Sequence, residues 1–86
     1  MARYSLLIRK SAAKELEAVP KKDRRRIITR IRDLADDPRP FGSEKLTGED
    51  KYRIRQGSFR VLYEILDADR IVRIVRVAHR RDVYRR

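Results

Sequence analysis

The residues with the strongest chemical signal are four arginines and a tyrosine in the second half of the chain: Arg53, Arg55, Arg60, Arg80 and Tyr84. Arg53 and Arg55 stand two positions apart, so a β-strand would direct both side chains to one face. Arg60 follows a short turn and can reach the same side. Cations gathered in this way suit the phosphates of a single-stranded nucleic acid, and a nearby aromatic ring can stack on a base. A polar outer face is also the default for an antiparallel sheet, so the pattern alone leaves function and plain solvation equally open.

The charge of the chain indicates the class of its partner. The 86 residues carry a net charge of +11, and from residue 51 to residue 86 eleven Lys or Arg stand against four Asp or Glu. Such a balance favours a polyanionic partner, either nucleic acid or an acidic protein. The length allows one domain, residues 1–86, with a single modest core.

Composition also argues against several classes of protein. With no cysteine and one histidine, we expect neither a metal nor another cofactor. No apolar run reaches the ~20 residues of a membrane helix, so we expect a soluble, cytoplasmic protein that makes no membrane contact.

Four segments have the patterns of strands. Residues 52–56 and 59–66 alternate apolar and polar side chains around the turn Gly57-Ser58, which predicts a hairpin. Residues 71–78 are apolar on both faces, which favours an interior strand. Residues 3–9 predict a further strand at the start of the chain.

Two helices and a loop fill the space between the first strand and the hairpin. Ser11 is a good N-cap for a short helix over residues 12–18. Apolar residues at helical spacing predict a second helix over residues 21–35. Residues 39–50 contain helix and strand breakers and predict a loop, which Phe41 and Leu46 are expected to pin to the core.

The order of these elements is β-α-α-β-β-β. It predicts an α+β fold in which a helical hairpin packs on one face of a four-stranded, mostly antiparallel sheet. The first strand is expected to pair in parallel with a later strand, because the helical hairpin forms a crossover between them.

The chain resembles a known family over nearly its whole length. The runs YRIRQGSFRVLYEI and RIVRVAHRRDVYRR, the start RYSLLIRKSAAKEL and the segments DDPRPFG and EKLTG are similar to the RelE/ParE superfamily of bacterial toxin–antitoxin systems. The ending HRRDVYR points to the RelE branch. The resemblance implies the RelE-like fold and a ribosome-dependent endoribonuclease, which cuts messenger RNA without a metal and so inhibits translation.

The resemblance also assigns roles to the five residues. The family's basic catalytic positions fall on Arg53 and Arg55, its phosphate-binding arginine on Arg60, the arginine after the last strand on Arg80 and the C-terminal tyrosine on Tyr84. The best-known pattern has lysines where this chain has Arg53 and Arg55. Arginine keeps the charge but is a poor proton carrier near neutral pH.

Cleavage of RNA needs a base for the ribose 2′-hydroxyl, an acid for the leaving 5′-oxygen and cations for the pentavalent phosphate. Tyr84 and His79 are candidates for the proton transfers, and Glu64 is a weaker one. A histidine after a strand more often packs or caps, and Glu64 more often pairs with a neighbouring arginine. Further cations are predicted to bind RNA: Lys45, Lys51, Arg81 and Arg85.

Two other functions fit the same pattern. A ParE-type toxin would have the same fold and would inhibit DNA gyrase by protein contact. A non-catalytic nucleic-acid-binding module would use the same cations without chemistry. The RelE-type function implies the ribosome, messenger RNA and a RelB-like antitoxin as partners, with toxin and antitoxin in a hetero-oligomer. The antitoxin should be acidic where it meets the arginines.

Overall fold

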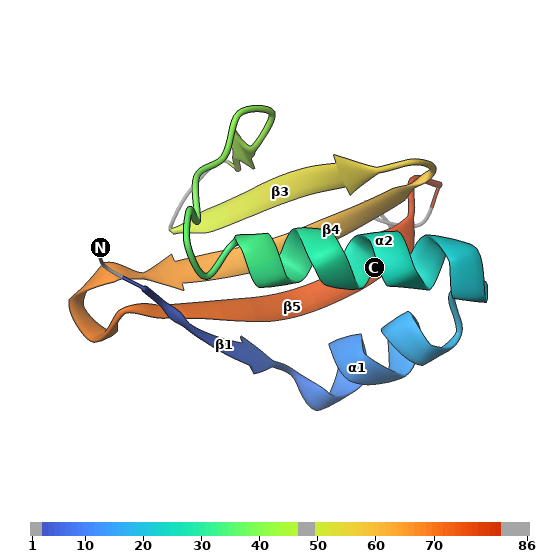
Figure 1. The fold of residues 1–86 in the computed structure, drawn as a ribbon, viewed down its shortest axis with the longest axis horizontal. Helices are drawn as coiled ribbons and strands as arrows, with labels where there is room; N and C mark the ends of the chain where they lie inside the picture. Colours follow the sequence, from blue (N-terminus) through green and yellow to red (C-terminus); the bar gives the residue numbers. More distant parts are fainter. Residues whose placement is uncertain (1–2, 47–49, 82–86) are drawn as a thin grey trace.

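The computed structural model describes residues 3–46 and 50–81. A five-stranded sheet with the strand order β1-β5-β4-β3-β2 carries two helices, as Figure 1 shows. The elements are β1 (Ser5–Ile8), α1 (Lys10–Glu17), α2 (Lys21–Asp33), β2 (Glu44–Lys45), β3 (Lys51–Gln56), β4 (Phe59–Leu66), the 3₁₀ turn η1 (Asp67–Asp69) and β5 (Ile71–His79).

The predicted topology is confirmed. β1 pairs with β5 in parallel, from Ser5 opposite Ile71 to Ile8 opposite Ile74. The pairs β3–β4 and β4–β5 are antiparallel, and β5 lies between β1 and β4 as the interior strand. Parallel strands need a long connection, and here the chain passes through the helical pair, β2 and the hairpin of β3 and β4 before it reaches β5.

The sheet has one strand more than the sequence predicted. β2 lies within the segment expected to lack regular structure, and it pairs with β3 through Glu44 opposite Arg53 and Lys45 opposite Tyr52. Two residues are too few to show a strand period, so the alternation that revealed the other strands is absent here. The expected four-stranded sheet is therefore corrected to five strands.

The hairpin between β3 and β4 has the predicted two-residue turn. Gly57 has φ 61°, a left-handed value that glycine adopts without the strain a Cβ brings, as at the first position of a type II′ turn. The turn brings Gln56 opposite Phe59 and Arg55 opposite Arg60. The register of the hairpin thereby decides which arginines face each other.

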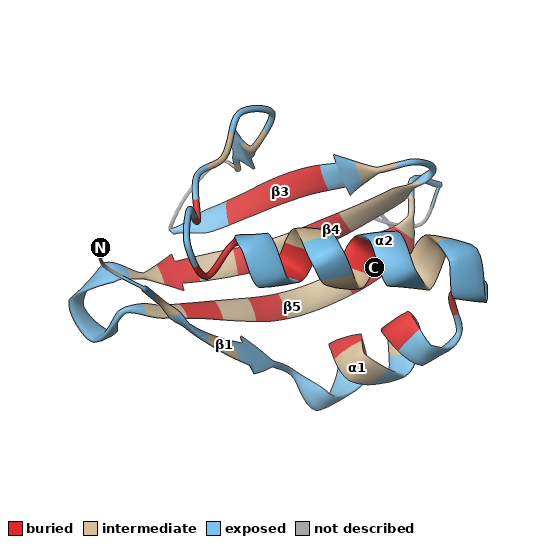
Figure 2. Cartoon of the chain, viewed as in Figure 1, coloured by how far each residue is buried: buried red, intermediate tan, exposed pale blue. Residues whose placement is uncertain are grey.

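The core lies between the sheet and the two helices (Figure 2). Val61, Tyr63 and Ile65 alternate along β4 and are fully buried. They meet Ile27 and Ile31 of α2, which belong to the predicted helical stripe. The Tyr63 hydroxyl donates to the carbonyl of Pro38 at 2.8 Å, so its buried polar atom is satisfied.

The helix boundaries differ slightly from the predicted ones. α1 begins at Lys10 with Arg9 as its N-cap and has no side-chain capping bond, so the prediction that Ser11 caps this helix is wrong. Pro20 is the N-cap of α2, as expected for a residue without an N–H. Neither helix in the described part of the chain combines the length and the apolar character that crossing a membrane requires.

Candidate nucleic-acid interface

Three strands bring four arginines together, and we call Arg53, Arg55, Arg60 and Arg80 the arginine cluster. Arg55 and Arg60 are directly opposite each other on β3 and β4. Opposite residues of an antiparallel pair direct their side chains to the same face, and Arg53 shares that face at period two. Their neighbours Ile54 and Val61 are fully buried toward the helices. The three arginines therefore lie on the face of the sheet that the helices do not cover.

Backbone contacts hold the ends of the strands that carry the cluster. The Arg80 N–H donates to the carbonyl of Ser58 at 2.7 Å, which ties the end of β5 to the hairpin turn. Arg30 of α2 donates from Nη1 to the carbonyl of Arg55 at 2.9 Å. Arg60 Nη1 donates to the carbonyl of Phe59 at 3.1 Å, within the same hairpin. The cluster is thus built on ordered elements, which favours a fixed geometry.

The positive charges of the arginine cluster repel one another. Desolvation lowers the pKa of Arg60, and the positive charges of Arg55, Arg53 and Arg80 lower it further. An arginine keeps its proton even so. Like charges held this close are unfavourable in the free protein, and a bound phosphate would relieve that repulsion.

Glu44 is the residue that sequence analysis missed. Its Oε1 atom lies 2.7 Å from Nη2 of Arg53 and 3.9 Å from Nη2 of Arg55. The hydrogen bond from Arg53 is the main cause that holds the pKa of Glu44 below its usual value, and the charges of Arg53, Arg55 and Arg60 add to it. Glu44 lies on β2, the strand that was not predicted, so no sequence pattern linked it to the arginines.

The two arginines of β3 differ in accessibility. The Arg53 residue is 9% exposed, whereas the Arg55 side chain is 63% exposed. Arg53 therefore mainly holds Glu44 in place, through its hydrogen bond to that carboxylate. Arg55 is open to a ligand.

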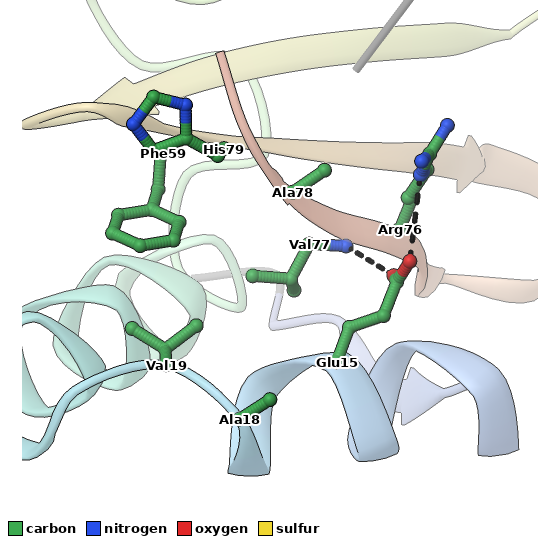
Figure 3. Close-up of a pocket in the computed structure, with 8 residues that line it drawn as sticks. All are labelled: Glu15, Ala18, Val19, Phe59, Arg76, Val77, Ala78 and His79. Carbon is green, nitrogen blue, oxygen red and sulfur yellow. Dashed lines mark hydrogen bonds and ion pairs between the residues drawn. The ribbon is translucent and has the colours of Figure 1, made fainter. Parts of the chain in front are cut away.

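His79 lies on the other face of the sheet. It stands opposite Phe59, and the two rings meet edge to face with their centroids 5.6 Å apart. Figure 3 shows both rings above the end of α1, beside a cavity that Val19 and Val77 also line. His79 Nδ1 accepts the N–H of Arg81 at 3.2 Å. The structure does not bring His79 together with the arginine cluster.

Glu64 is held in an ion pair of its own. Its Oε1 atom lies 2.8 Å from Nε and 2.7 Å from Nη2 of Arg73, on the neighbouring strand β5. Four residues of extended strand separate it from Arg60, a span of about 13 Å. The structure thus gives Glu64 the pairing role that was its simpler interpretation.

The remaining predicted residues are scattered. Lys51 shares the face of Arg53 and stands opposite Glu64, whereas Lys45 stands opposite Tyr52, whose side chain belongs to the core. Arg81 is exposed in the turn after β5. Tyr84 and Arg85 lie outside the described residues.

Comparison with known proteins places this arrangement in a family. The model of the family described as "ParE toxin of type II toxin-antitoxin system, parDE" matches residues 6–84. A protein of Methanocaldococcus jannaschii named as toxin RelE1 is 32% identical over 87 residues, which cover 96% of this chain and 97% of that protein. The chain belongs to the RelE/ParE toxin superfamily. The resemblance noted in the sequence is confirmed.

Solved structures of RelE toxins share the fold of this RelE/ParE toxin. The RelE–RelB complex of Pyrococcus horikoshii gives a TM-score of 0.82 at 32% identity, covering 96% of this chain and 100% of that chain. The RelBE2 toxin–antitoxin complex of Mycobacterium tuberculosis gives 0.78 at 26% identity, covering 90% and 98%. The chain is therefore a toxin of the RelBE type by family, and its arginine cluster is the natural place to look for the toxic activity.

Proposed function

We propose that this toxin is an endoribonuclease that cuts messenger RNA on the ribosome without a metal. The observation that carries the proposal is the arginine cluster with Glu44 inside it. Guanidinium groups bind phosphate oxygens in a fixed planar geometry. Their repulsion in the free protein favours binding of a phosphodiester. A carboxylate at the same place adds the capacity to accept a proton, which a site that only binds RNA does not need.

In the proposed reaction the ribose 2′-oxygen attacks the adjacent phosphorus. Glu44, which is ionised near neutral pH as carboxylates usually are, accepts the proton of the 2′-hydroxyl. Arg55, Arg60 and Arg80 stabilise the charge of the pentavalent phosphate. The bond to the 5′-oxygen then breaks, leaving a 2′,3′-cyclic phosphate and a 5′-hydroxyl.

The family resemblance places the C-terminal tyrosine at Tyr84 without fixing its step, and a phenol is able to carry the second proton. We propose that Tyr84 donates the proton that the leaving 5′-oxygen takes up. Arg53 has a positioning role, because it is largely buried and bonded to Glu44. Arginine at this position fits such a role, since it supplies charge and hydrogen bonds without a proton transfer.

The experiment that tests the proposal is primer extension on a defined messenger RNA in a reconstituted translation reaction. We expect cuts that appear with the wild-type protein, require ribosomes and disappear with Arg60→Ala. Binding of RNA without product under all conditions would favour a non-catalytic module instead.

A second candidate is inhibition of DNA gyrase, favoured by the family model, which is described as a ParE toxin. A supercoiling assay in a parallel reaction separates the two. Blocked supercoiling with uncut messenger RNA would replace the nuclease proposal.

We further propose that a RelB-like antitoxin holds the toxin inactive. The support is the net charge of +11 and the likeness to RelE chains whose structures were solved with RelB. An acidic antitoxin segment over the arginine cluster would neutralise the same guanidinium groups that bind RNA. The exposed Leu7 and Ile8 of edge strand β1 offer an apolar contact for a second segment.

A further inference from the structure

We propose that Phe41 is a stacking platform for a nucleobase of the RNA bound at the arginine cluster, an inference that rests on the proposed function. The relative exposure of Phe41 is 104%, so its ring does not pack against the core. The expectation that this residue pins its loop to the core is wrong. A fully exposed phenyl ring forgoes the stabilisation that burial would give, which points to a partner for it.

The ring stands on a tight turn. The Ser43 N–H donates to the carbonyl of Pro40 at 3.0 Å, which closes a four-residue turn with Phe41 at its second position. Gly42 at the third position has φ 95°, close to the value that a type II turn requires there. An added Cβ at Gly42 would meet nothing within 4 Å, so the backbone conformation and not space explains the glycine. The turn fixes where Phe41 projects.

The loop is anchored before the turn. Arg39 donates from Nη2 and Nη1 to the two carboxylate oxygens of Asp67, at 2.8 and 3.3 Å, and from Nε to the Tyr52 hydroxyl at 3.1 Å. Its own N–H donates to Asp37 Oδ1 at 3.2 Å. The chain therefore enters the turn from a fixed point.

The loop is anchored after the turn as well. Glu44 is bonded to Arg53 and pairs with it on the ladder between β2 and β3. Phe41 thus lies between two fixed points, in the segment between α2 and β2. Figure 1 shows this segment as the green loop beside β3. A platform held in this way loses little freedom when a base stacks on it.

The turn is close to the arginine cluster. Phe41 precedes Glu44 by three positions, so their Cα atoms lie at most about 11 Å apart. A strand of RNA with a phosphate on Arg55 therefore has neighbouring nucleotides within reach of the ring. Cations along the backbone combined with an aromatic ring for the bases is the usual arrangement of single-strand binding sites. A base is proposed as the occupant because single-stranded RNA supplies both parts of this arrangement, phosphates for the arginines and bases for the ring.

The chain contains no tryptophan, which gives a direct test. In Phe41→Trp the new side chain is the sole indole, and a base stacked on it quenches its fluorescence. The ligand is a single-stranded RNA with 2′-O-methyl riboses, so it binds without being cut. The control ligand is an abasic strand of equal length, which keeps the phosphates and lacks the bases.

We expect quenching with the base-containing strand and none with the abasic strand. We also expect Phe41→Ala to bind the base-containing strand about 5- to 100-fold more weakly than the wild type, as loss of one stacked base predicts. Phe41→Leu should share this loss, because it keeps apolar bulk without an aromatic face. The melting temperature should not change in any variant, since the ring contacts nothing that stabilises the fold.

Equal affinity of wild type and Phe41→Ala for the base-containing strand would overturn the proposal. So would a loss confined to antitoxin binding, which would make Phe41 a protein anchor. Arg60→Ala separates this inference from the proposed function, because its cleavage should vanish while the indole of an Arg60→Ala, Phe41→Trp double variant is still quenched by RNA. If RNA quenches the indole of Phe41→Trp but the wild type cuts no messenger RNA, the stacking proposal would hold and the nuclease proposal would fail.

Discussion

Two of the places where arginine and carboxylate meet in this toxin differ in charge balance. Arg39 and Asp67 form a two-pronged ion pair to which Tyr4 and Tyr52 add hydrogen bonds; we call these four residues the Arg39–Asp67 network. In the arginine cluster Glu44 lies 2.7 Å from Arg53 and 3.9 Å from Arg55, and the described residues place four guanidinium groups around this one carboxylate charge. The network lies past one end of β4 and the cluster near the other end.

The two places differ in whether the protein balances its own charges. In the network each charge has an opposite charge, and the pKa of Asp67 is lowered by the hydrogen bonds of Arg39 and Tyr4. In the cluster the positive charges exceed the negative one, and the pKa of Arg60 is lowered by desolvation and by its own neighbours. Charge that the protein does not balance itself is available to a polyanion.

The largest expected effect comes from Glu44→Gln. If Glu44 accepts the proton, cleavage should fall about 10²- to 10⁴-fold, whereas affinity for uncut RNA should rise because a negative charge leaves the site. Primer extension and binding of a 2′-O-methyl strand measure the two quantities. Cleavage that rises together with affinity would reduce Glu44 to a counter-ion.

Arg60→Ala should lower ribosome-dependent cleavage about 10²- to 10³-fold, the effect of removing one group that stabilises transition-state charge. The matched control is Arg32→Ala, the same change at an exposed position of α2. It should keep activity within about threefold, because α2 covers the opposite face of the sheet from the one that carries Arg60. An equal loss in both variants would mean that total charge matters and the cluster does not.

Tyr63→Phe should destabilise the fold by about 1 kcal/mol, because the hydrogen bond to the Pro38 carbonyl is lost. Burial raises the pKa of Tyr63 to about 12. A group whose pKa is raised on folding stabilises fully below its unfolded pKa, near 10, and loses that contribution as the pH rises through about 12. Urea unfolding between pH 9 and 12 should therefore show a steeper loss for the wild type than for Tyr63→Phe, and parallel curves would contradict this.

Asp67→Asn should have the smallest effect, since exposed ion pairs contribute little. The lowered pKa of Asp67 means that its contribution is present above the unfolded pKa and is lost as the pH falls through the folded one. The variant should melt slightly below the wild type at pH 7, and the difference should shrink as the pH falls through the lowered pKa of folded Asp67. Cleavage should not change. A loss of cleavage would mean that the Arg39–Asp67 network also contributes to activity.

The sequence predicted the elements whose side chains follow a regular period, and it missed those too short or irregular to show one. The alternation in β4 and the Gly57-Ser58 turn determine a hairpin, and the register then sets Arg55 opposite Arg60. These are local patterns with a known geometry, so the arginine cluster could be anticipated from them.

The misses come from contacts between distant segments. Glu44 meets Arg53 only because a two-residue strand forms, and Phe41 is exposed because of how the loop folds back. His79 follows β5 as predicted, but its position in the register opposite Phe59 turns it away from the arginines. A one-residue change in register reverses the face of a side chain, and sequence alone rarely fixes it.

Glu15 covers a stretch of the β5 edge that would otherwise be open to pairing with another chain. Beyond the last residue of β1, the open edge of β5 would offer its backbone to another chain, but Oε1 of Glu15 accepts the Val77 N–H at 2.9 Å, and Oε2 lies 3.4 Å from Nε of Arg76 (Figure 3). A carboxylate in the place of a neighbouring strand ends the ladder with a charge, as proteins do to prevent polymerisation through sheet edges. A single helix side chain thereby covers the stretch of β5 that β1 does not reach, while β1 itself remains the edge strand.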